Sequence, residues 1–206
     1  MYALVTDGTI TKYFNHPKGF TLGDLQYPKD IFMKWSVEEK EAIGIYEVVF
    51  NNSNKKDEQW YINTNQSFAF ADDTVTASYG TATAKAHADT TWSQDDEDAG
   101  DLPDDKSVGD VKVEGLKTTL IRTLKQQVAG ILNDTDWYIT RNAEKETAIP
   151  SSISTHRDAV RTKQAQMETA ITNASNTPAL ETLYTYTKQS DGSVTRPLGE
   201  LPTLEI

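Results

Sequence analysis

A run of acidic residues between Ser93 and Asp110 divides this chain of 206 residues into two parts with different sequence patterns. Eight Asp and Glu residues in the run are opposed by a single lysine, Lys106. Charges of one sign repel each other, and Gly100 and Pro103 interrupt any helix or strand. The sequence therefore predicts an acidic linker over residues 91–112.

The first 90 residues carry the short β-branched and aromatic runs that are typical of strands. Tyr2–Thr6 and Thr9–Phe14 are joined by Asp7-Gly8, which suits a type I′ turn because both turn positions need positive φ. A short helix is expected after Ser36, whose hydroxyl can accept from the amide of Glu39 in a capping box. Further strands are expected at Ile45–Phe50, Gln59–Ile62, Ser67–Phe70 and Thr74–Tyr79.

After the linker, the apolar residues recur at helical spacing. One stripe predicts a helix over Glu114–Leu132, and a second short segment follows at Trp137–Glu146. A third helix, after Ser151, carries a matching stripe, so the two long helices are expected to pack as an antiparallel hairpin. The stripe residues are Leu116, Leu120, Leu124, Val128 and Ile131 in the first helix, and Ile153, Val160, Met167 and Ile171 in the third.

These patterns together predict an α+β chain. Its parts are a small antiparallel β-rich N-terminal domain, the acidic linker, a C-terminal α-helical hairpin unit and a polar tail containing Pro and Gly. The predicted bounds are 1–90, 91–112, 113–188 and 189–206.

The net charge of the chain limits the kinds of molecule that it is expected to bind, and the absence of cysteine limits its chemistry. The net charge is −11, whereas nucleic acids and anionic membrane surfaces both attract Lys and Arg, so neither is expected to bind. No apolar run is long enough to span a bilayer, and the N-terminus lacks the pattern of a secretory signal. The absence of cysteine excludes thiolate chemistry and fits synthesis in a reducing cytoplasm.

The sequence contains no pattern that predicts catalysis. It lacks a nucleophile elbow, a P-loop, a dinucleotide fingerprint and a zinc-protease motif. His16, His87 and His156 lie in different segments, and His156 is expected at the surface or in the hairpin. The acidic run also lacks the Asp register and distal Glu of a calcium loop. We therefore expect no enzymatic activity, metal or cofactor.

One cluster in the helical part has the composition of a binding surface. Trp, Tyr and Arg dominate the energetics of protein interfaces. In the alternative, intramolecular interpretation, the Trp fills the elbow between two helices and an Arg pairs with a nearby acid; residue types alone favour this second interpretation. The candidate partner-binding residues are Asp136, Trp137, Tyr138, Arg141, Arg157 and Arg161.

The same stretch resembles the C-terminal region of tailed-bacteriophage tail assembly chaperones. The resemblance covers about residues 114–187 and is carried by Thr135-Asp-Trp137, then Ile149-Pro150, then Arg157-x-x-Val160-Arg161. In those proteins an aromatic residue often stands where His156 stands here. A second resemblance, to the variable front end of such phage proteins, rests on the opening MYALVTDG and on the segment after Gly44.

The resemblance implies a non-enzymatic protein that helps tail fibres or related tail proteins to fold and assemble. Two roles follow. The first is a transient assembly chaperone in the host cytoplasm, whose helical unit holds a fibre end. The second is a permanent virion component, such as a fibre-attachment, tail or capsid-surface protein, with the β-rich domain docking and the helices forming a homo-oligomer.

Overall fold

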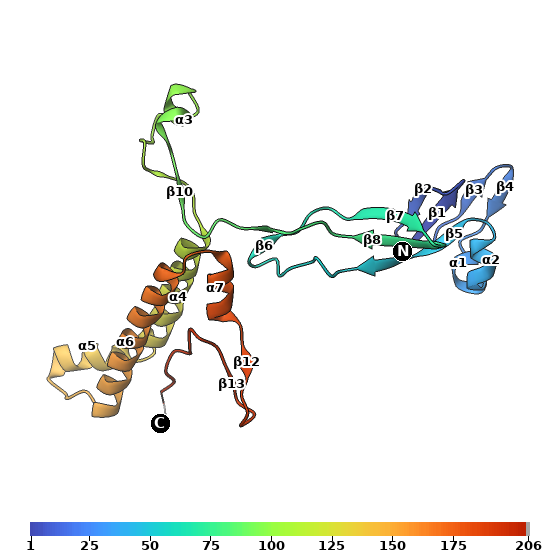
Figure 1. The fold of residues 1–206 in the computed structure, drawn as a ribbon. Helices are drawn as coiled ribbons and strands as arrows, with labels where there is room; N and C mark the ends of the chain where they lie inside the picture. The colour runs from blue at the N-terminus through green and yellow to red at the C-terminus, as the bar shows by residue number, and fades with distance from the viewer. Residues whose placement is uncertain (205–206) are drawn as a thin grey trace. The chain divides into compact units, whose positions relative to one another are not determined.

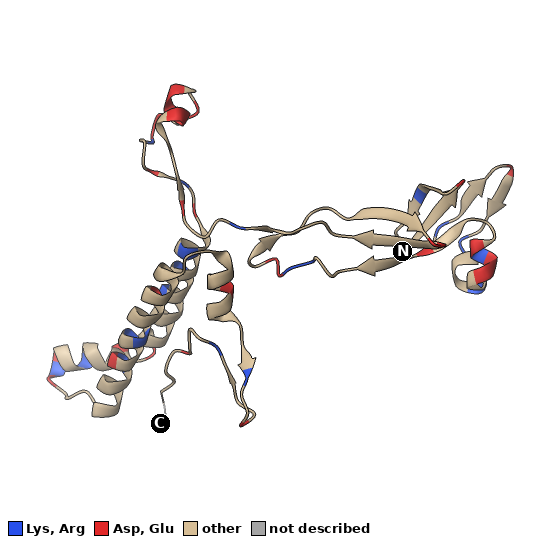
Figure 2. Cartoon of the chain, in the orientation of Figure 1, with Lys and Arg blue, Asp and Glu red and all other residues tan. Residues whose placement is uncertain are grey.

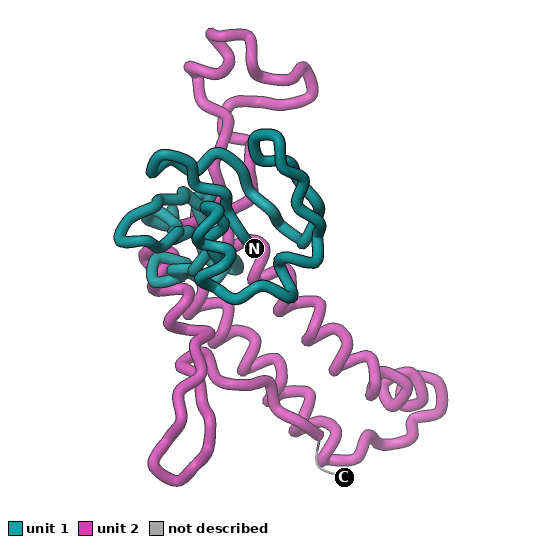
Figure 3. Tube along the Cα trace, turned by 90° about the vertical axis from the view of Figure 1, so that its right-hand side faces the viewer, with its two compact units in different colours: residues 1–83 teal, residues 84–206 magenta. Residues whose placement is uncertain are grey.

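A computed structural model describes residues 1–204 and divides the chain into two compact units, Met1–Thr83 and Ala84–Ile206 (Figures 1 and 3). The first unit is built mainly from strands and the second mainly from helices. The chain therefore has an α+β fold, as the sequence predicts. The boundary after Thr83 falls before the predicted one at residue 90.

A five-stranded sheet forms the first unit, with strand order β2-β1-β5-β8-β7. Most neighbouring pairs are antiparallel, as predicted, but β5 and β8 are parallel, so the sheet is mixed. The strands are β1 (Tyr2–Thr6), β2 (Thr9–Phe14), β5 (Ile45–Asn51), β7 (Ser67–Ala71) and β8 (Thr74–Ser78). Shorter strands lie at β3 (Phe20–Leu22), β4 (Leu25–Tyr27), β6 (Tyr61–Ile62) and β9 (Thr83–Ala84).

Two tight turns fix the register of the sheet. Asp7 and Gly8 have φ of 51° and 72°, and Asp72 and Asp73 have φ of 48° and 55°. Positive φ at both central positions gives the type I′ geometry that matches the twist of paired strands. The predicted hairpin at Asp7-Gly8 is thereby confirmed, and β7 and β8 are joined in the same way.

The sheet buries residues on both of its faces. Leu4, Phe14 and Ile45 pack on one face against residues of the loop and helices that precede β5, α1 (Ile31–Lys34) and α2 (Val37–Glu41). Ala3, Val5, Val48, Val75 and Ala77 form a second cluster. The rings of Tyr13 and Phe68 lie 4.7 Å apart, so the two edge strands β2 and β7 approach each other and the sheet curls.

The short helix α2 begins at the predicted capping box. The Ser36 hydroxyl accepts from the amide of Glu39 at 3.1 Å, and the Glu39 carboxylate accepts from the amide of Ser36 at 2.8 Å. Gly44 follows with φ of 82°, and its carbonyl accepts from the Val5 amide. These contacts tie the chain after α2 to β1 and start β5 in register.

The predicted acidic linker is folded. Strands β10 (Thr90–Thr91) and β11 (Val111–Val113) pair antiparallel, and α3 (Gln94–Asp98) lies between them. Ser93 caps α3 in a capping box with Asp96, and Lys112 pairs with the Asp96 carboxylate. Acidic residues stabilise the first turn of a helix because its free amides carry positive charge, so local charges here fold the segment instead of extending it.

The second unit contains the predicted helical hairpin. The long helices α4 (Leu116–Asn133) and α6 (Ser151–Asn173) run antiparallel, because Lys117 bonds the carbonyl of Thr172 at one end and Arg157 bonds that of Leu132 at the other. The predicted stripe residues Leu124 and Val128 on α4, with Ile153, Val160, Met167 and Ile171 on α6, are buried. Two shorter helices, α5 (Asp136–Lys145) and α7 (Thr177–Tyr184), complete it.

The predicted polar tail returns to the helical unit. Strands β12 (Thr187–Lys188) and β13 (Val194–Thr195) form a hairpin around the expected turn at Asp191-Gly192. Leu198 is then buried, and its amide donates to the carbonyl of Leu183 in α7. Within residues 1–204, no helix has the length and apolar character needed to cross a membrane.

Candidate partner-binding surface

Arg157 organises the junction between α4 and α5. Its guanidinium donates to the carbonyl of Leu132 at 2.8 Å, to the Thr135 hydroxyl at 2.6 Å and to the Asp136 carboxylate at 2.8 Å. The last carbonyls of a helix have no partner within the helix, so this bond satisfies one end of α4. Arg157 is only 7% exposed, and Thr135 is buried. The guanidinium therefore fixes the angle at which α5 leaves α4.

Asp136 is the first residue of α5 and couples it to α6. Its carboxylate lies at the positive end of the helix dipole and pairs with Arg157 at 2.8 Å. The Asp136 side chain is half exposed, whereas the Arg157 side chain is buried. The pair joins the start of α5 to the body of the hairpin.

Trp137, Tyr138 and Arg141 form a stacked cluster on α5. The two rings have centroids 3.8 Å apart, and the guanidinium carbon of Arg141 lies 4.7 Å from the Trp137 ring and 5.3 Å from the Tyr138 ring. Trp137 is 51% exposed, although a side chain of this size is usually largely buried. The guanidinium and the rings thus present a rigid, amphipathic surface to solvent.

Some residues of the predicted cluster make contacts inside the chain, and others lie at the surface. Arg157 pairs with Asp136 inside the chain, as the intramolecular interpretation expects. Trp137 does not fill the elbow between the helices, because Thr135 and Arg157 occupy it, and the indole lies at the surface. Arg157 and Asp136 therefore hold α5 in place, while Trp137, Tyr138 and Arg141 are available for contact.

Arg161 lies outside this surface. It follows Arg157 by one turn of α6, and its guanidinium is 3.6 Å from the carboxylate of Asp158 on the same helix. Its side chain is 52% exposed. The structure thus brings together five of the six predicted residues and leaves Arg161 as a surface residue of α6.

A cavity of about 500 Å³ adjoins the aromatic cluster. Trp137 and Tyr138 form one wall, and Pro150 and Ile153 at the start of α6 form another. Leu204 also contributes, and it belongs to the segment predicted as a polar tail. The signal that could have predicted its return is the apolar spacing of Leu198, Leu201 and Leu204. The remaining lining residues are Asp134, Thr135 and Ser152.

His156 lies in the hairpin, which is one of the two positions predicted for it. It is buried, and it lines a neighbouring cavity with Pro202, Thr203 and Leu204. The returning tail covers this side of α6, so His156 has a packing role here. In the described part of the chain, no group of three or more His, Asp or Glu side chains could hold a metal ion.

No protein-family model, curated protein or solved structure matches this chain.

Proposed function

We propose that this chain is a non-enzymatic bacteriophage protein that binds a tail or tail-fibre protein and assists tail assembly in the host cytoplasm. The surface formed by Trp137, Tyr138 and Arg141 makes the contact. The observation that carries the proposal is the exposure of Trp137 in a cluster that the Arg157 junction holds rigid. Aromatic and Arg residues of this kind anchor protein partners when they are held in place before binding.

The partner class comes from the sequence resemblance of residues 114–187 to tail assembly chaperones. The cavity beside Trp137 supports binding of a protein partner in general, because an apolar side chain can enter between the aromatic rings and Ile153. Arg141, which lies against the Trp137 and Tyr138 rings, adds a cation that suits a carboxylate or carbonyl group on the partner. The net charge of −11 keeps such a complex soluble and disfavours nucleic acid.

Co-expression with the tail and fibre proteins of the same phage tests this role. The wild-type chain is expected to co-purify with its partner. The double variant, which carries Trp137→Ala and Arg141→Ala, is expected not to. Phe50→Ala is the matched control, because Phe50 is an aromatic residue of similar exposure in the β-rich unit. Retention of the partner by the double variant would contradict the proposal.

A second role, as a permanent virion component, is favoured by the exposed area of the chain. The chain exposes 13357 Å². A compact monomer of 22.9 kDa exposes about 9,600 Å², and two separate compact bodies of the lengths of these units expose about 11,500 Å². Separating the units could only add exposed area, so the excess over two compact bodies lies within the units themselves and is the kind of surface that an assembly buries. Mass spectrometry of purified particles separates the roles, because only a permanent component remains in mature virions.

A further inference from the structure

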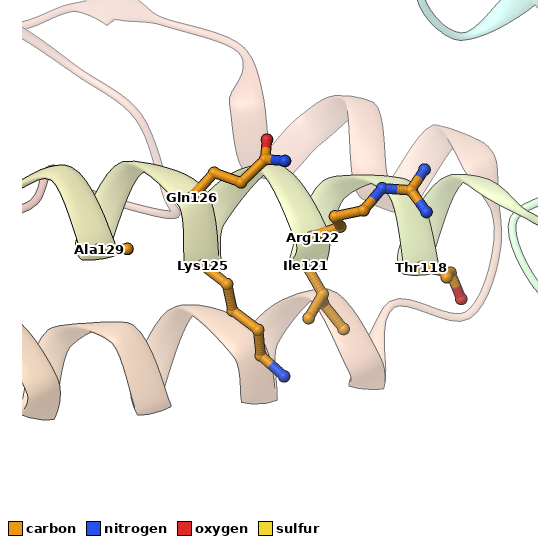
Figure 4. A pocket seen from close by; sticks show the side chains of 6 residues that line it. All are labelled: Thr118, Ile121, Arg122, Lys125, Gln126 and Ala129. Carbon is orange, nitrogen blue, oxygen red and sulfur yellow. The ribbon is translucent and has the colours of Figure 1, made fainter.

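An open groove on α4 has an apolar floor and a basic rim. It has a volume of about 500 Å³, and all its lining residues come from consecutive turns of that helix (Figure 4). Ile121 and Ala129 supply apolar surface, and Arg122 and Lys125 supply cations. Thr118 and Gln126 complete the lining. The groove lies on α4, away from the aromatic cluster of α5.

The charge of α4 is opposite to that of the chain. The helix carries Lys117, Arg122 and Lys125 and no acidic residue, although the net charge of the chain is −11. Arg122 pairs with Glu114 at 2.7 Å, and Lys125 lies 4.0 Å from Glu168, but both cationic side chains are more than half exposed. Exposed ion pairs contribute little to stability, so the carboxylates of an acidic segment can replace Glu114 and Glu168 as partners of the two rim cations.

The acidic arm, which we define as residues Ser93–Asp110, has the complementary composition. Figure 2 shows acidic residues gathered at α3, in contrast to the basic residues along α4. Asp96 is held by Lys112, but the carboxylates of Asp101 and Asp104 have no hydrogen-bond or ion-pair partner within residues 1–204. Leu102 and the exposed Val108 lie among these carboxylates. The arm thus carries two apolar side chains close to the free carboxylates of Asp101 and Asp104.

We infer that the α4 groove of one copy binds the acidic arm of a second copy of this chain. Leu102 and Val108 match the apolar floor, and the carboxylates of Asp101 and Asp104 match Arg122 and Lys125 on the rim. Arm and groove are different surfaces of one chain, so the contact runs head to tail. Such a contact closes into a ring or continues as a filament.

Sedimentation velocity over a range of protein concentrations, at low and high salt, tests the inference. The wild-type chain is expected to associate with increasing concentration, and high salt is expected to weaken association because it screens the rim charges. Two double variants each remove the charges on one side of the proposed contact. The arm variant carries Asp101→Asn and Asp104→Asn, and the groove variant carries Arg122→Gln and Lys125→Gln. Each alone is expected to raise the dissociation constant about tenfold or more.

Mixing the two variants gives the decisive result. The arm of the groove variant and the groove of the arm variant are both intact, so an equal mixture is expected to form dimers that do not grow. Lys18→Gln with Lys29→Gln changes the net charge by the same amount as the groove variant and should leave association unchanged. Ala129→Glu, which preserves helix propensity, should block the groove. A wild type that stays monomeric, or a mixture that stays monomeric, overturns the inference.

Discussion

At the scale of single residues, Arg157 and Trp137 belong to one junction but lie in opposite environments. Arg157 is buried and makes three hydrogen bonds within the chain, whereas Trp137 contacts its neighbours on α5 and leaves half of its surface in water. Removal of each of these two side chains is therefore expected to change a different property of the protein. Loss of Arg157 is expected to affect folding of the helical unit, and loss of Trp137 is expected to affect the proposed binding.

Arg157→Met is expected to destabilise the helical unit by about 2 kcal/mol, because it removes the ion pair with Asp136 and the buried donor to the Thr135 hydroxyl, while the Leu132 carbonyl keeps the amide and hydroxyl of Thr135 as donors. Urea unfolding followed by helical circular dichroism measures the change. Arg161→Met is the matched control on the same helix, and it should stay within about 0.5 kcal/mol of the wild type, since its ion pair is exposed. Equal effects of the two substitutions would contradict this assignment.

Gly44→Ala is expected to destabilise the β-rich unit by about 2 kcal/mol. A Cβ at Gly44 would overlap the carbonyl oxygen of Val5, and the φ of 82° is strained for alanine. Gly23→Ala has a similar φ of 58° and nothing near its Cβ, so it should cost only about 1 kcal/mol. Urea unfolding of both variants measures how much more Gly44→Ala destabilises the protein than Gly23→Ala does. Equal losses of unfolding free energy would show that backbone strain alone, and not the overlap with Val5, acts at Gly44.

At the scale of elements, the acidic arm depends on Asp96. The Lys112 ammonium that pairs with this carboxylate, together with donors from Ser93, lowers its pKa from the usual 3.8 to about 2. A lowered pKa means that the contribution of Asp96 to the arm is fully present above pH 3.8 and is lost as pH falls through about 2. Neutral pH therefore keeps α3 capped and the arm folded.

Carboxyl NMR of Asp96 tests this dependence. The wild-type midpoint is expected near pH 2, and Lys112→Met is expected to move it upward toward 3.8, since the largest stabilising contact of the carboxylate is lost. Lys106→Met is the control, because Lys106 lies beside Asp105 instead. A wild-type midpoint at 3.8 would mean that Asp96 does not hold the arm together.

Local signals in the sequence predicted much of the secondary structure. The Asp7-Gly8 turn, the Ser36 capping box and the apolar stripes of α4 and α6 each act within a few residues, so the elements they define could be placed without the fold. The parallel pairing of β5 with β8 could not be predicted in this way, because it joins strands separated by more than twenty residues. The acidic composition of the arm predicted a linker extended by charge repulsion. This prediction was wrong, because Ser93 caps α3 and the segment folds.

The proximity of five of the six candidate residues was predictable from the sequence, but the exclusion of Arg161 and the burial of each residue were not. Residue types placed Asp136, Trp137 and Arg157 together, and the fold does so too. Which of them is buried depends on how α5 leaves α4, and that angle is set by long-range bonds from Arg157. The contribution of Leu204 to the cavity likewise depends on the path of the chain after β13.

At the scale of the whole molecule, the proposed activities use separate surfaces. We propose the aromatic cluster of α5 for a foreign partner, and the α4 groove with the acidic arm for self-association. The exposed area, which exceeds that of two compact bodies, is consistent with a chain that buries several surfaces on assembly. Loss of one contact should therefore leave the other intact, and the two can be measured separately.

Isothermal titration of the identified partner with wild type and Trp137→Ala tests the central claim, that this chain binds protein through its exposed aromatic cluster. The account predicts a loss of about 2 kcal/mol of binding free energy, roughly thirtyfold in Kd, with helical circular dichroism and thermal stability close to wild type. Unchanged affinity for a folded Trp137→Ala would contradict it, as would unfolding of the helical unit by this substitution.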